Sequence, residues 1–565
     1  MLQSEKRWQL PSPVSGHALP GDIPAPIVQV LIGRGIDTAE KLHLFLGTPH
    51  MLPYNPLRLS GMELALRRLY QAIERGEKVG IFGDFDVDGL TGTAIVAGGL
   101  KAFGVSYIPY LPHRVDEGHG LSAEAIRQLS QEGVSLIVTV DCGVTSVAEV
   151  NAAGGSGIDV IITDHHTPAT GLPAASAIIN PRISGNKYPF LELSGAGLAF
   201  KLVQGLFQYY GQPWDQSLLE LAALGTIADL VPLVDENRFL VSQGLERLSR
   251  TQRPGLQALF RWSGVQPESI NVEAASFQVI PRLNSSGRMG HAMDSFLLLT
   301  TESPEEAESL AERLEKLNQE RRDLTERAFA AADQLVQGQS VLPSILLVED
   351  QTITPGVAGL VAGRLVERYR RPAIVMSSTS EDYVVASARS IPGFNLIEAL
   401  TTCESLFVRY GGHAQAAGFT LLKERIPRLT ERLTGIADER LSSQDLQPLL
   451  QIDAEIKLAD LGKPLFQWLR QLEPFGPGNT QPTFLTRGAE IAETQFVGQQ
   501  GQHVKLRVRD RGQEWTALAF NQAKTWVNPA SGIDLVYAVT TDSWNGSERI
   551  TLKILDARPP ADGGQ

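Results

Sequence analysis

Three carboxylates stand at alternate positions in the segment DFDVDG, which directly follows the apolar run KVGIF. Asp84, Asp86 and Asp88 would share one face of an extended chain. Their mutual repulsion is relieved when a cation lies among them, and Mg²⁺ and Mn²⁺ prefer such oxygen ligands. The spacing also matches the start of an EF-hand loop, but the twelfth position of that loop would be Ile95 in place of glutamate. The segment therefore predicts a magnesium or manganese site, with a solvated acidic turn as the alternative.

Further acids and imidazoles follow other apolar runs. Asp141 ends LIVTVD, Asp164-His165-His166 follows DVIIT, and Asp229 lies within the mostly apolar LAALGTIADLVPL. Each has an ordinary alternative: a helix cap for Asp141, a hydrogen-bonded core position for either histidine, and an arginine partner for Asp229. A carboxylate in an apolar segment is nevertheless costly to bury without a partner. Together with the DFDVDG carboxylates, these residues form an oxygen and imidazole set that suits two manganese or magnesium ions, and the lack of a cysteine ligand disfavours zinc-thiolate chemistry.

Alternating helix and strand patterns surround these segments from about Gly61 onward. An amphipathic helix is predicted by the apolar positions Met62, Leu64, Leu66, Leu69 and Ile73. The runs KVGIF, VSYIPYLP, LIVTV and DVIIT predict strands, and TGTAIVAGGLKAFG predicts a helix of small residues. This rhythm predicts an α/β fold with an open parallel sheet, which binds ligands at the carboxyl ends of its strands. The acidic residues stand at those ends.

A capping box at Ser303 predicts the start of a long helix. One side of this helix carries Leu310, Leu314, Leu317 and Leu324. A connecting helix between two lobes is favoured over a coiled-coil partner site, because Arg321 interrupts the apolar seam. A second α/β lobe follows, with the strands SILLVED and PAIVMSS, the helix VAGLVAGRLVERY, and the glycine-rich YGGHAQAAGF at its end.

After Leu450 the pattern changes to alternating strands. The runs HVKLRVRD, EWTALAF, DLVYAVT and ERITLKIL, with a turn at 544–546, predict a small β-barrel. Lys505, Arg507 and Arg509 alternate along one of these strands and would share a face.

Composition limits the class of protein. A chain of 565 residues exceeds a single core, so three or four domains are expected. Cys142 and Cys403 are too few for a disulfide framework, which favours a reducing cytoplasm. No stretch approaches the roughly 20 apolar residues that span a bilayer, and MLQSEKRWQLPSP lacks the apolar core of a signal peptide. A net charge of −13 argues against a polyanionic partner, but metal-binding carboxylates contribute to it and a local basic channel can coexist with it.

The motifs, taken in order, resemble those of a known family. DFDVDG, TVDCG, TDHH and GTIADLVPL match the four motifs of the DHH phosphoesterases, and GGHAQAAGF is similar to the glycine-rich segment of their companion DHHA1 domain. RLNSSGR, ARSIPGFN, LEPFGPGN and SWNG resemble the RecJ exonucleases within this DHH/DHHA1 family. The resemblance covers essentially the whole chain from about Gly61 onward.

The resemblance implies roles for particular residues. The metal ligands would be Asp86, Asp88, Asp141, His165 and Asp229. Asp84 would contact an ion or support a ligand, and Asp141 would bridge the two ions. His166 would face the substrate phosphate, as an electrostatic stabiliser or a general acid. Two ions would activate water and stabilise the departing oxygen.

Arginines are expected to bind the substrate phosphates, because their planar guanidinium matches phosphate oxygens. The candidates for substrate binding are Arg114, Arg282, Arg288, Arg389, Gly411, Gly412 and His413. For each arginine, a surface salt bridge is an equally good interpretation. His113 and His119 are given no role, and Cys142 is interpreted as a packing residue.

The predicted barrel resembles an OB-fold, in which Trp515 and Trp544 could offer stacking surfaces to a single strand. A solvent-facing row of polar residues explains Lys505, Arg507 and Arg509 equally well. The chain departs from the RecJ pattern at Ile353-Thr354, where Trp-His is expected before Pro-Gly-Val. This departure puts in doubt the contribution of that turn to substrate contact.

The expected organisation is a DHH parallel-sheet lobe and a DHHA1 lobe joined by a long helix, followed by the barrel. The boundaries are an N-terminal region at 1–60, DHH at 61–245, a helical connector at 246–338, DHHA1 at 339–445, the OB-like domain at 446–558 and a tail at 559–565.

The resemblance implies a metal-dependent exonuclease acting on single-stranded DNA, from 5′ to 3′, in repair and recombination. A helicase or a single-strand-binding protein would be its partner. Two alternatives stay open: a phosphodiesterase of short oligonucleotides or cyclic dinucleotides, and a noncatalytic single-strand-binding replication scaffold. The barrel disfavours the first, and the complete ligand set disfavours the second.

Overall fold

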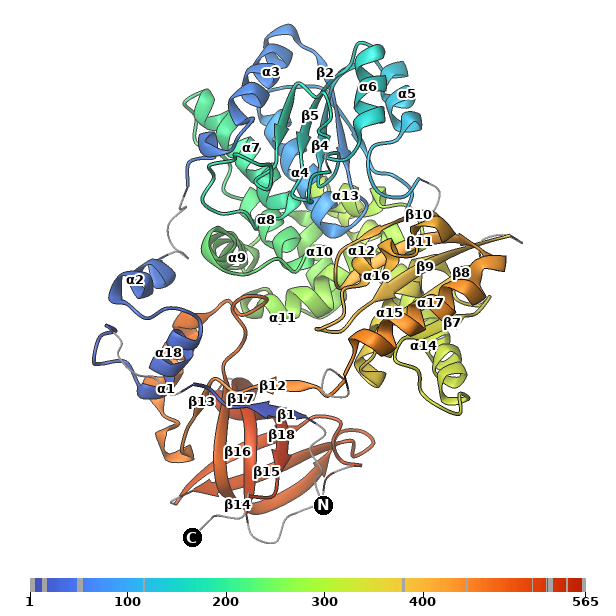
Figure 1. The fold of residues 1–565 in the computed structure, drawn as a ribbon. Coiled ribbons are helices and arrows are strands. Elements are labelled where there is room, and N and C mark those ends of the chain that lie inside the picture. The colour runs from blue at the N-terminus through green and yellow to red at the C-terminus, as the bar shows by residue number, and fades with distance from the viewer. Residues whose placement is uncertain are drawn as a thin grey trace. The chain divides into compact units, whose positions relative to one another are not determined.

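The computed structural model describes residues 6–12, 18–47, 54–114, 117–169, 171–378, 382–442, 446–510, 512–524, 526, 532–544 and 547–560. The chain forms two compact units. The larger unit comprises Thr48–Ser442 with Gly476–Gly478, and the smaller comprises Met1–Gly47, Ser443–Phe475 and Asn479–Gln565. Figure 1 shows the elements of both.

The first lobe of the larger unit contains a five-stranded parallel sheet in the order β3-β2-β4-β5-β6. Its strands are β2 (Lys78–Gly83), β3 (Tyr107–Tyr110), β4 (Val134–Val140), β5 (Asp159–Thr163) and β6 (Ala177–Ile179). The four predicted strands and their parallel arrangement are confirmed. Because β2, β4 and β5 are adjacent and parallel, the acidic segments that follow them meet at one edge of the sheet.

Helices cover both faces of this sheet. On one face, α3 (Met62–Arg75), α4 (Val87–Ala102) and α7 (Gly195–Tyr209) share a core with Ile81 and Val138. On the other, α5 (Ala123–Gln131) and α6 (Val147–Gly155) share a core with Phe82 and Ile137. Neighbouring residues thus enter opposite cores, as the two-residue period of a strand requires.

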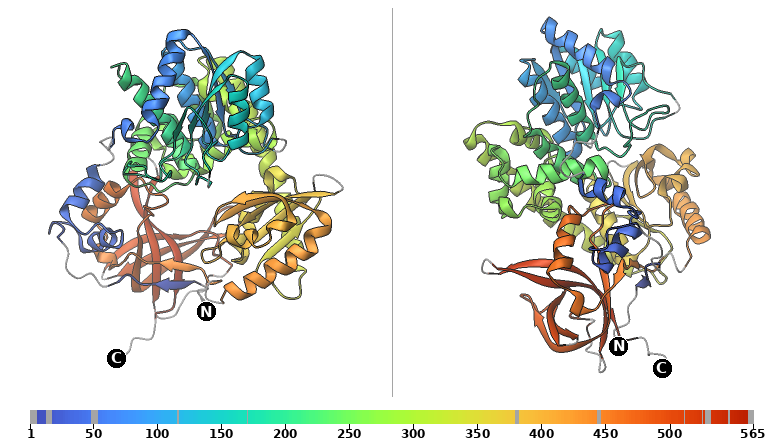
Figure 2. Two further views of the ribbon diagram at one scale, coloured as in Figure 1. Left: turned by 45° about the horizontal axis from the view of Figure 1, so that its top comes forward. Right: turned by 90° about the vertical axis from the view of Figure 1, so that its left-hand side faces the viewer.

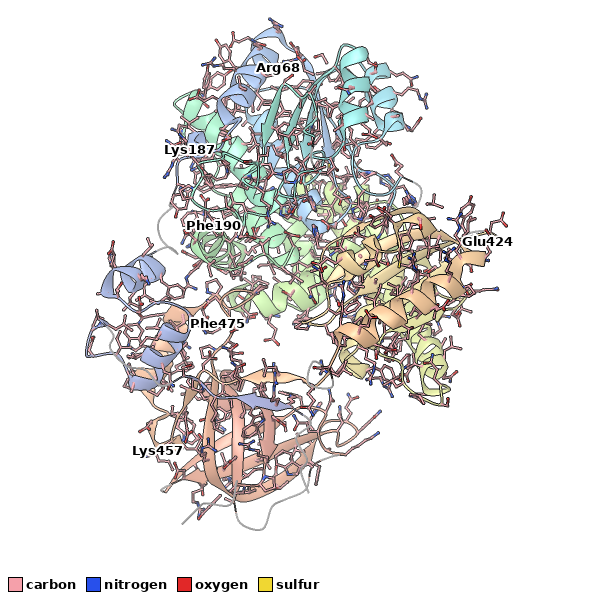
Figure 3. All side chains as sticks on the ribbon, in the orientation of Figure 1. Arg68, Lys187, Phe190, Glu424, Lys457 and Phe475 are labelled. Atoms are coloured by element: carbon pink, nitrogen blue, oxygen red, sulfur yellow. The ribbon has the colours of Figure 1, made fainter. Side chains whose placement is uncertain are left out.

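An ion-pair group links α3 to the starts of two strands of the sheet. Arg68 on α3, labelled in Figure 3, lies 2.6 Å from Glu77 and 2.5 Å from Asp159 at the start of β5. One apolar position of α3 was assigned wrongly, since Leu64 faces outward with 56% of its surface exposed. Ala65 and Ala72 occupy the buried face instead.

A helical segment follows the first lobe. It contains α8 (Leu218–Ala228), α9 (Asp235–Leu248), α10 (Pro254–Ser263), α11 (Val272–Ala274), the π-helical turn η4 (Ala275–Val279), α12 (Ile280–Met289), α13 (Met293–Thr300) and α14 (Pro304–Gln337). The hydroxyl of Ser303 accepts a hydrogen bond from the Glu306 amide at 3.2 Å, as predicted for the start of α14. Leu310 and Leu314 pack in the first-lobe core, and Phe329 packs in the second-lobe core. The structure therefore supports the connecting role of α14.

The second lobe contains a five-stranded sheet in the order β10-β11-β9-β8-β7. Its strands are β7 (Leu346–Glu349), β8 (Ala373–Ser378), β9 (Tyr383–Arg389), β10 (Phe407–Gly412) and β11 (Ala416–Leu422), of which β7 and β8 pair in parallel. Its helices are α15 (Pro355–Tyr369), α16 (Leu396–Thr401) and α17 (Ile426–Arg440). The glycine-rich YGGHAQAAGF forms the turn and flanking strands of the β10–β11 hairpin.

The smaller unit is a β-barrel with an added helical layer, and Figure 2 shows its orange and red strands curving round one core. Its sheet contains β13 (Ala454–Glu455), β14 (Thr483–Val497), β15 (His503–Asp510), β16 (Gln513–Ala519), β17 (Ile533–Trp544) and β18 (Ser547–Arg558), and pairing of β14 with β17 closes it. The predicted barrel is confirmed, although β14 was not recognised in the sequence. The predicted turn at 544–546 includes Asn545 and Gly546, which lie outside the described residues.

The N-terminal region belongs to this barrel unit. Strand β1 (Arg7–Gln9) pairs in parallel with β12 (Leu449–Gln451). Helices α1 (Ala25–Gly33) and α2 (Ala39–Gly47) share the barrel core and lie near α18 (Lys463–Leu472). Ile27 and Leu31 of α1 are fully buried there. Among the described helices of both units, none is long and apolar enough to cross a membrane.

Candidate metal and phosphate site

The DFDVDG segment turns from β2 into α4, and its own carboxylates shape that turn. Asp86 caps α4, because one of its oxygens accepts hydrogen bonds from the amides of Asp88 at 3.0 Å and Gly89 at 3.2 Å. Gly89 permits the turn, since a Cβ there would lie 2.5 Å from the Asp84 carbonyl oxygen. The predicted extended segment is thus a tight turn, and it still brings the carboxylates together.

Asp88 is fixed by a neighbouring helix. Its two oxygens accept hydrogen bonds from the amides of Gly195 at 2.6 Å and Ala196 at 2.9 Å, in the first turn of α7. A helix N-terminus favours a negative group. Gly195 also allows close approach to Asp141, because a Cβ at this position would lie 2.5 Å from the Asp141 Cβ. The sequence analysis missed the SGAG segment that forms this support; its signal was a run of small residues before a helix.

Asp141 lies directly after β4 in a left-handed backbone conformation, with φ of 62°. Such a conformation is uncommon outside glycine and often marks functional positions. Its Oδ1 lies 3.1 Å from Nε2 of His165, and the other neighbour of that nitrogen is Asp229 Oδ2 at 3.6 Å. Asp229 directly follows α8 and is its C-terminal capping residue.

Two buried atoms in this cluster lack a hydrogen bond. Asp141 Oδ1 and His165 Nε2 are both unsatisfied among the described residues, although they are close, because their mutual orientation does not suit a hydrogen bond. Orphaned buried polar atoms are rare and costly. A cation that accepts both lone pairs would satisfy them, so these atoms fit a metal site.

The electrostatics of the cluster also fit a cation. Burial and Asp86 raise the pKa of Asp88 to about 7, and burial and Asp88 raise the pKa of Asp229 to about 9. Burial raises the pKa of Asp141 well above its usual range. Burial and His166 lower the pKa of His165 to about 3, which leaves its imidazole neutral and able to bind a metal. Without a cation, the crowded carboxylates favour protonation.

The ligand atoms form three overlapping groups, each with all atoms within 4.8 Å of one another. The groups are Asp84, Asp86 and Asp141; Asp88, His165 and Asp229; and Asp141, His165 and His166. Asp141 and His165 each belong to two groups. Of the two, the Asp141 carboxylate has two oxygens that could contact two ions, which fits the bridging position expected for it. The five expected ligands and Asp84 are therefore brought together.

His166 is held by Asp164, a residue to which the family resemblance assigned no role. Asp164 Oδ1 lies 2.7 Å from Nδ1 of His166, and it also accepts a hydrogen bond from the His166 amide at 3.0 Å. Although burial lowers the pKa of His166, this hydrogen bond outweighs it and raises the pKa to about 9. Asn180 donates to the His166 carbonyl at 2.9 Å. His166 is thus a fixed, positively charged donor beside the cluster.

Three of the four candidate arginines converge near the acidic cluster. Arg114 lies over the Phe85 ring at 4.6 Å and interacts electrostatically with Asp86 and Asp84. Burial, together with Arg114 and Arg389, lowers the pKa of Arg288 to about 9, so Arg288 is still charged at neutral pH. No described carboxylate forms an ion pair with Arg288 or Arg389. A buried group of like charges implies an anionic partner.

Arg282 does not join this group. Its guanidinium is buried, forms an ion pair with Glu315 of α14 and donates to the Gln278 carbonyl at 2.5 Å. These contacts disfavour the substrate role assigned to it and make it a link between α12 and α14. Arg182, which the sequence analysis missed, interacts electrostatically with Asp229, His165 and His413 and pairs with Glu192 at 2.8 Å.

The β10–β11 hairpin brings His413 to the first lobe. The rings of His413 and His166 lie nearly parallel, with centroids 6.0 Å apart. Gly412 has φ of 141°, and a Cβ there would lie 2.4 Å from the Ala416 carbonyl oxygen. The geometry of the hairpin therefore requires a glycine at position 412. This requirement explains Gly412 without the substrate contact that was expected of it. Gly411 is exposed beside it.

His119 was wrongly set aside. Its Nδ1 lies 2.8 Å from Asp84 Oδ2, and its ring lies 4.4 Å from the Phe85 ring. The ring of His113 lies 6.4 Å from that of His291. Cys142 is buried in a lobe core, and burial raises the pKa of its thiol well above its usual range, which agrees with a packing role.

The barrel offers less to a nucleic acid than predicted. Arg507 pairs with Glu493 at 2.9 Å, and Arg509 pairs with Glu514 at 2.5 Å. Trp515 is half-buried against the barrel core and donates to the Leu458 carbonyl at 3.0 Å, so only part of its ring is available for stacking. Lys505 is exposed on the same strand, and the side chain of Trp544 lies outside the described residues.

At Ile353-Thr354 the chain enters α15. Ile353 is buried in the second-lobe core. Gly356 lies against α12, since a Cβ there would lie 2.4 Å from the Arg288 carbonyl oxygen, and Arg288 Nη1 donates to the Gly356 carbonyl at 3.3 Å. The glycine of this turn thus positions Arg288, whereas Ile353 serves packing.

Comparison with known proteins identifies three regions. The model of the DHH family, N-terminal domain, matches residues 78–226, the DHHA1 domain matches 338–439, and the RecJ OB domain matches 452–556. The DHH and OB matches lie within the domains expected from the sequence, and the DHHA1 match begins one residue before the expected start at 339. The expected boundaries stay predictions.

The relatives match over almost the whole chain. The single-stranded-DNA-specific exonuclease RecJ of Bacillus subtilis is 39% identical over 99% of this chain and 71% of its own, and that of Escherichia coli is 32% identical over 95% and 96%. The crystal structure of RecJ in complex with Mn²⁺ from Thermus thermophilus aligns with a TM-score of 0.84 at 29% identity, covering 98% of this chain and 80% of that one. The Mg²⁺ complex from the same organism aligns with a TM-score of 0.78 at 27% identity, covering 98% and 79%. The chain belongs to the RecJ family.

Proposed function

We propose that this chain is a divalent-metal-dependent exonuclease that hydrolyses the phosphodiester bonds of single-stranded DNA. The observation that carries the proposal is the buried carboxylate and imidazole cluster, with its orphaned Asp141 Oδ1 and His165 Nε2, beside a group of unneutralised arginines. A metal-binding acid cluster and an anion-binding basic cluster at one place suit a phosphate ester. The printed names of the relatives supply the single-stranded DNA and the exonuclease reaction.

The acidic residues and His165 would bind the metal ions, whereas His166 and the arginines would bind the substrate. Asp86, Asp88, Asp141, His165 and Asp229 would hold two Mn²⁺ or Mg²⁺ ions, and Asp84 would support them. When bound, such ions supply a nucleophilic water and neutralise the developing negative charge. Asp88 is presented by the first turn of α7, so its carboxylate needs little rearrangement.

The substrate side is formed by His166 and the arginines. Asp164 fixes the His166 ring, so its Nε2 can donate a hydrogen bond to a phosphate oxygen or a proton to the departing oxygen. Arg114, Arg288 and Arg389 bind phosphates without reading bases. His413 reaches the same region from the second lobe, and the barrel adds binding surface for a longer strand.

Finer features of the function belong to this proposal as well. We propose 5′-to-3′ polarity, a role in repair and recombination, a cytoplasmic location, and a helicase or single-strand-binding protein that provides the single strand. Each agrees with hydrolysis of single-stranded DNA in a reducing compartment.

The deciding experiment uses single-stranded and duplex DNA labelled at the 5′ or the 3′ end, with Mg²⁺, Mn²⁺ or chelator. The proposal expects mononucleotide release from a 5′-labelled single strand, no release from blunt duplex, and no reaction with chelator. Release of the 3′ label first would overturn the polarity. Internal cuts, or inactivity on single strands with either ion, would overturn the function.

A further inference from the structure

The loop between β3 and α5 carries two residues that reach the candidate site. Arg114 lies over the Phe85 ring at 4.6 Å, and His119 contacts Asp84 at 2.8 Å. Both come from the segment HRVDEGHG, in which Val115 and Asp116 lie outside the described residues. A long loop that delivers two side chains with this accuracy needs an internal constraint.

Glu117 supplies such a constraint. One carboxylate oxygen accepts a hydrogen bond from the His113 amide at 2.7 Å. The other accepts hydrogen bonds from the Tyr110 hydroxyl at 2.8 Å and the Ser122 hydroxyl at 3.2 Å. Glu117 also closes the turn through its own amide, which donates to the His113 carbonyl at 2.9 Å.

These partners lie at the ends of the loop. Tyr110 is the last residue of β3, and Ser122 is the N-terminal cap of α5, whose hydroxyl also accepts from the Ala125 amide at 3.1 Å. The carboxylate of Glu117 therefore joins the strand end, the loop start and the helix start. Three hydrogen bonds to one ionised group are stronger and more directional than those of a neutral acceptor.

The sequence spacing connects this constraint to the site. Arg114 stands three residues before Glu117, and His119 stands two residues after it. The two side chains contact Phe85 and Asp84, neighbours in the metal-binding turn. We propose that Glu117 is a positioning residue that sets Arg114 against the substrate phosphate and His119 against Asp84. The proposal rests on the proposed function.

Loss of Glu117 should act on reaction rate with little effect on stability. The loop is at the surface, and Glu117 is only partly buried. Removing residues that orient ligands typically lowers activity by about 10- to 100-fold. Glu117→Ala is therefore expected to lower kcat/KM on single-stranded DNA by roughly that factor. Glu117→Gln keeps the shape and an acceptor for the hydroxyls, so it should recover most of the activity.

The matched control is Glu124→Ala. Glu124 lies on α5 and contacts Arg127 and Gln128 of its own helix. Among the described residues it forms no hydrogen bond or ion pair with the loop, although its charge acts weakly on Tyr110. This variant should keep the wild-type kcat/KM. Thermal unfolding midpoints of all variants separate an effect on the site from general destabilisation.

The decisive test is a mutant cycle in single-turnover cleavage of a 5′-phosphorylated single strand with Mg²⁺. In the Arg114→Ala/His119→Ala background, Glu117→Ala should change the rate by less than about 2-fold, because the residues it positions are gone. A full 10-fold or greater loss in that background would overturn the proposal, as would wild-type activity of Glu117→Ala. Inactivity of the wild-type protein on single strands would instead overturn the proposed function. That measurement uses the wild-type protein alone, so it is independent of the positioning role of Glu117.

Discussion

At Asp141 three unfavourable features coincide: a left-handed backbone, burial, and a carboxylate oxygen without a hydrogen bond. None of them stabilises the metal-free fold, and the bridging position between two ligand groups explains all three. Asp141→Ala should lower kcat by roughly 1000-fold or more, equivalent to about 4 kcal/mol of transition-state stabilisation. The metal-free variant should unfold at the same temperature as wild type or higher, because carboxylate repulsion is relieved. Mn²⁺-supported activity near the wild-type level would contradict the bridging assignment.

The raised pKa values of Asp88, about 7, and Asp229, about 9, give a pH prediction. Their pKa values in the folded protein lie above the unfolded values, so they favour the metal-free fold below pH 4 and lose this contribution as pH rises through 7 and 9. Metal binding requires the ionised forms and releases their protons. The increase in unfolding temperature caused by saturating Mg²⁺ should therefore grow between pH 6 and pH 9. The pH dependence of this Mg²⁺-induced increase should be smaller in Asp229→Asn. An increase in unfolding temperature that does not change with pH would contradict competition between protons and Mg²⁺ for these carboxylates.

Leu230 offers a prediction of stability. It follows Asp229 with φ of 59° and 66% of its surface exposed, so burial does not compensate for its strained backbone. A left-handed conformation costs about 1–2 kcal/mol for such a residue. Substitution by glycine removes this strain, but the greater backbone entropy of glycine in the unfolded chain offsets part of the stabilisation. Leu230→Gly should raise the free energy of unfolding by about 0.5–1 kcal/mol. The matched control Leu64→Gly, at an exposed helical position, should lower it by about 1 kcal/mol. Destabilisation by both substitutions in denaturant titrations would show that Leu230 has contacts its exposure conceals.

Elements position the site through close helix packing, and Gly225 on α8 is one position where helices pack closely beside a proposed ligand. A Cβ there would lie 2.4 Å from Ala196 Cβ on α7 and 2.8 Å from Asp88 Oδ1 on α4. Gly225→Ala should cost about 1–3 kcal/mol and lower activity, because it displaces Asp88 and separates helices that carry ligands. Gly435→Ala on α17 has no atom within 4 Å of the added carbon, so it should be neutral or stabilising by up to about 1 kcal/mol. Equal stability and activity of the two variants would contradict this account.

The sequence patterns predicted the elements whose signals are local. The strands before Asp84, Asp141 and Asp164 were recognised because their β-branched runs end in acids, and parallel pairing then brought these acids to one edge. The support of Asp88 by the amides of α7 could not be recognised, because it joins segments more than 100 residues apart and uses backbone groups. The role of His119 was missed for a similar reason, since its partner Asp84 lies on another strand end. The ion pair of Arg282 with Glu315, which disfavours a substrate role, could not be recognised from a motif.

At the scale of the whole molecule, the two ends of the sequence fold together. Helix α1 packs in the barrel core through Ile27 and Leu31, and β1 pairs with β12. The larger unit contains every proposed metal ligand. A division of the chain that respects these units therefore differs from a simple C-terminal deletion.

Removal of residues 450–565 alone would leave the apolar face of α1 and the edge of β1 without partners, and this variant should aggregate. A fragment of 48–442 removes all three segments of the smaller unit, together with Gly476–Gly478 of the larger unit. It should remain folded, with some loss of stability because the Leu233 amide loses its hydrogen bond to Pro477. Its single-turnover cleavage rate at saturating DNA should stay within about 10-fold of the intact protein, since no ligand is removed. Its affinity for strands of 30 nucleotides or more should fall much further, and its salt dependence should weaken, because the phosphate contacts that we propose for the barrel would be lost. If the cleavage rate falls as far as the affinity does, the barrel is part of the catalytic unit and the two functions cannot be separated.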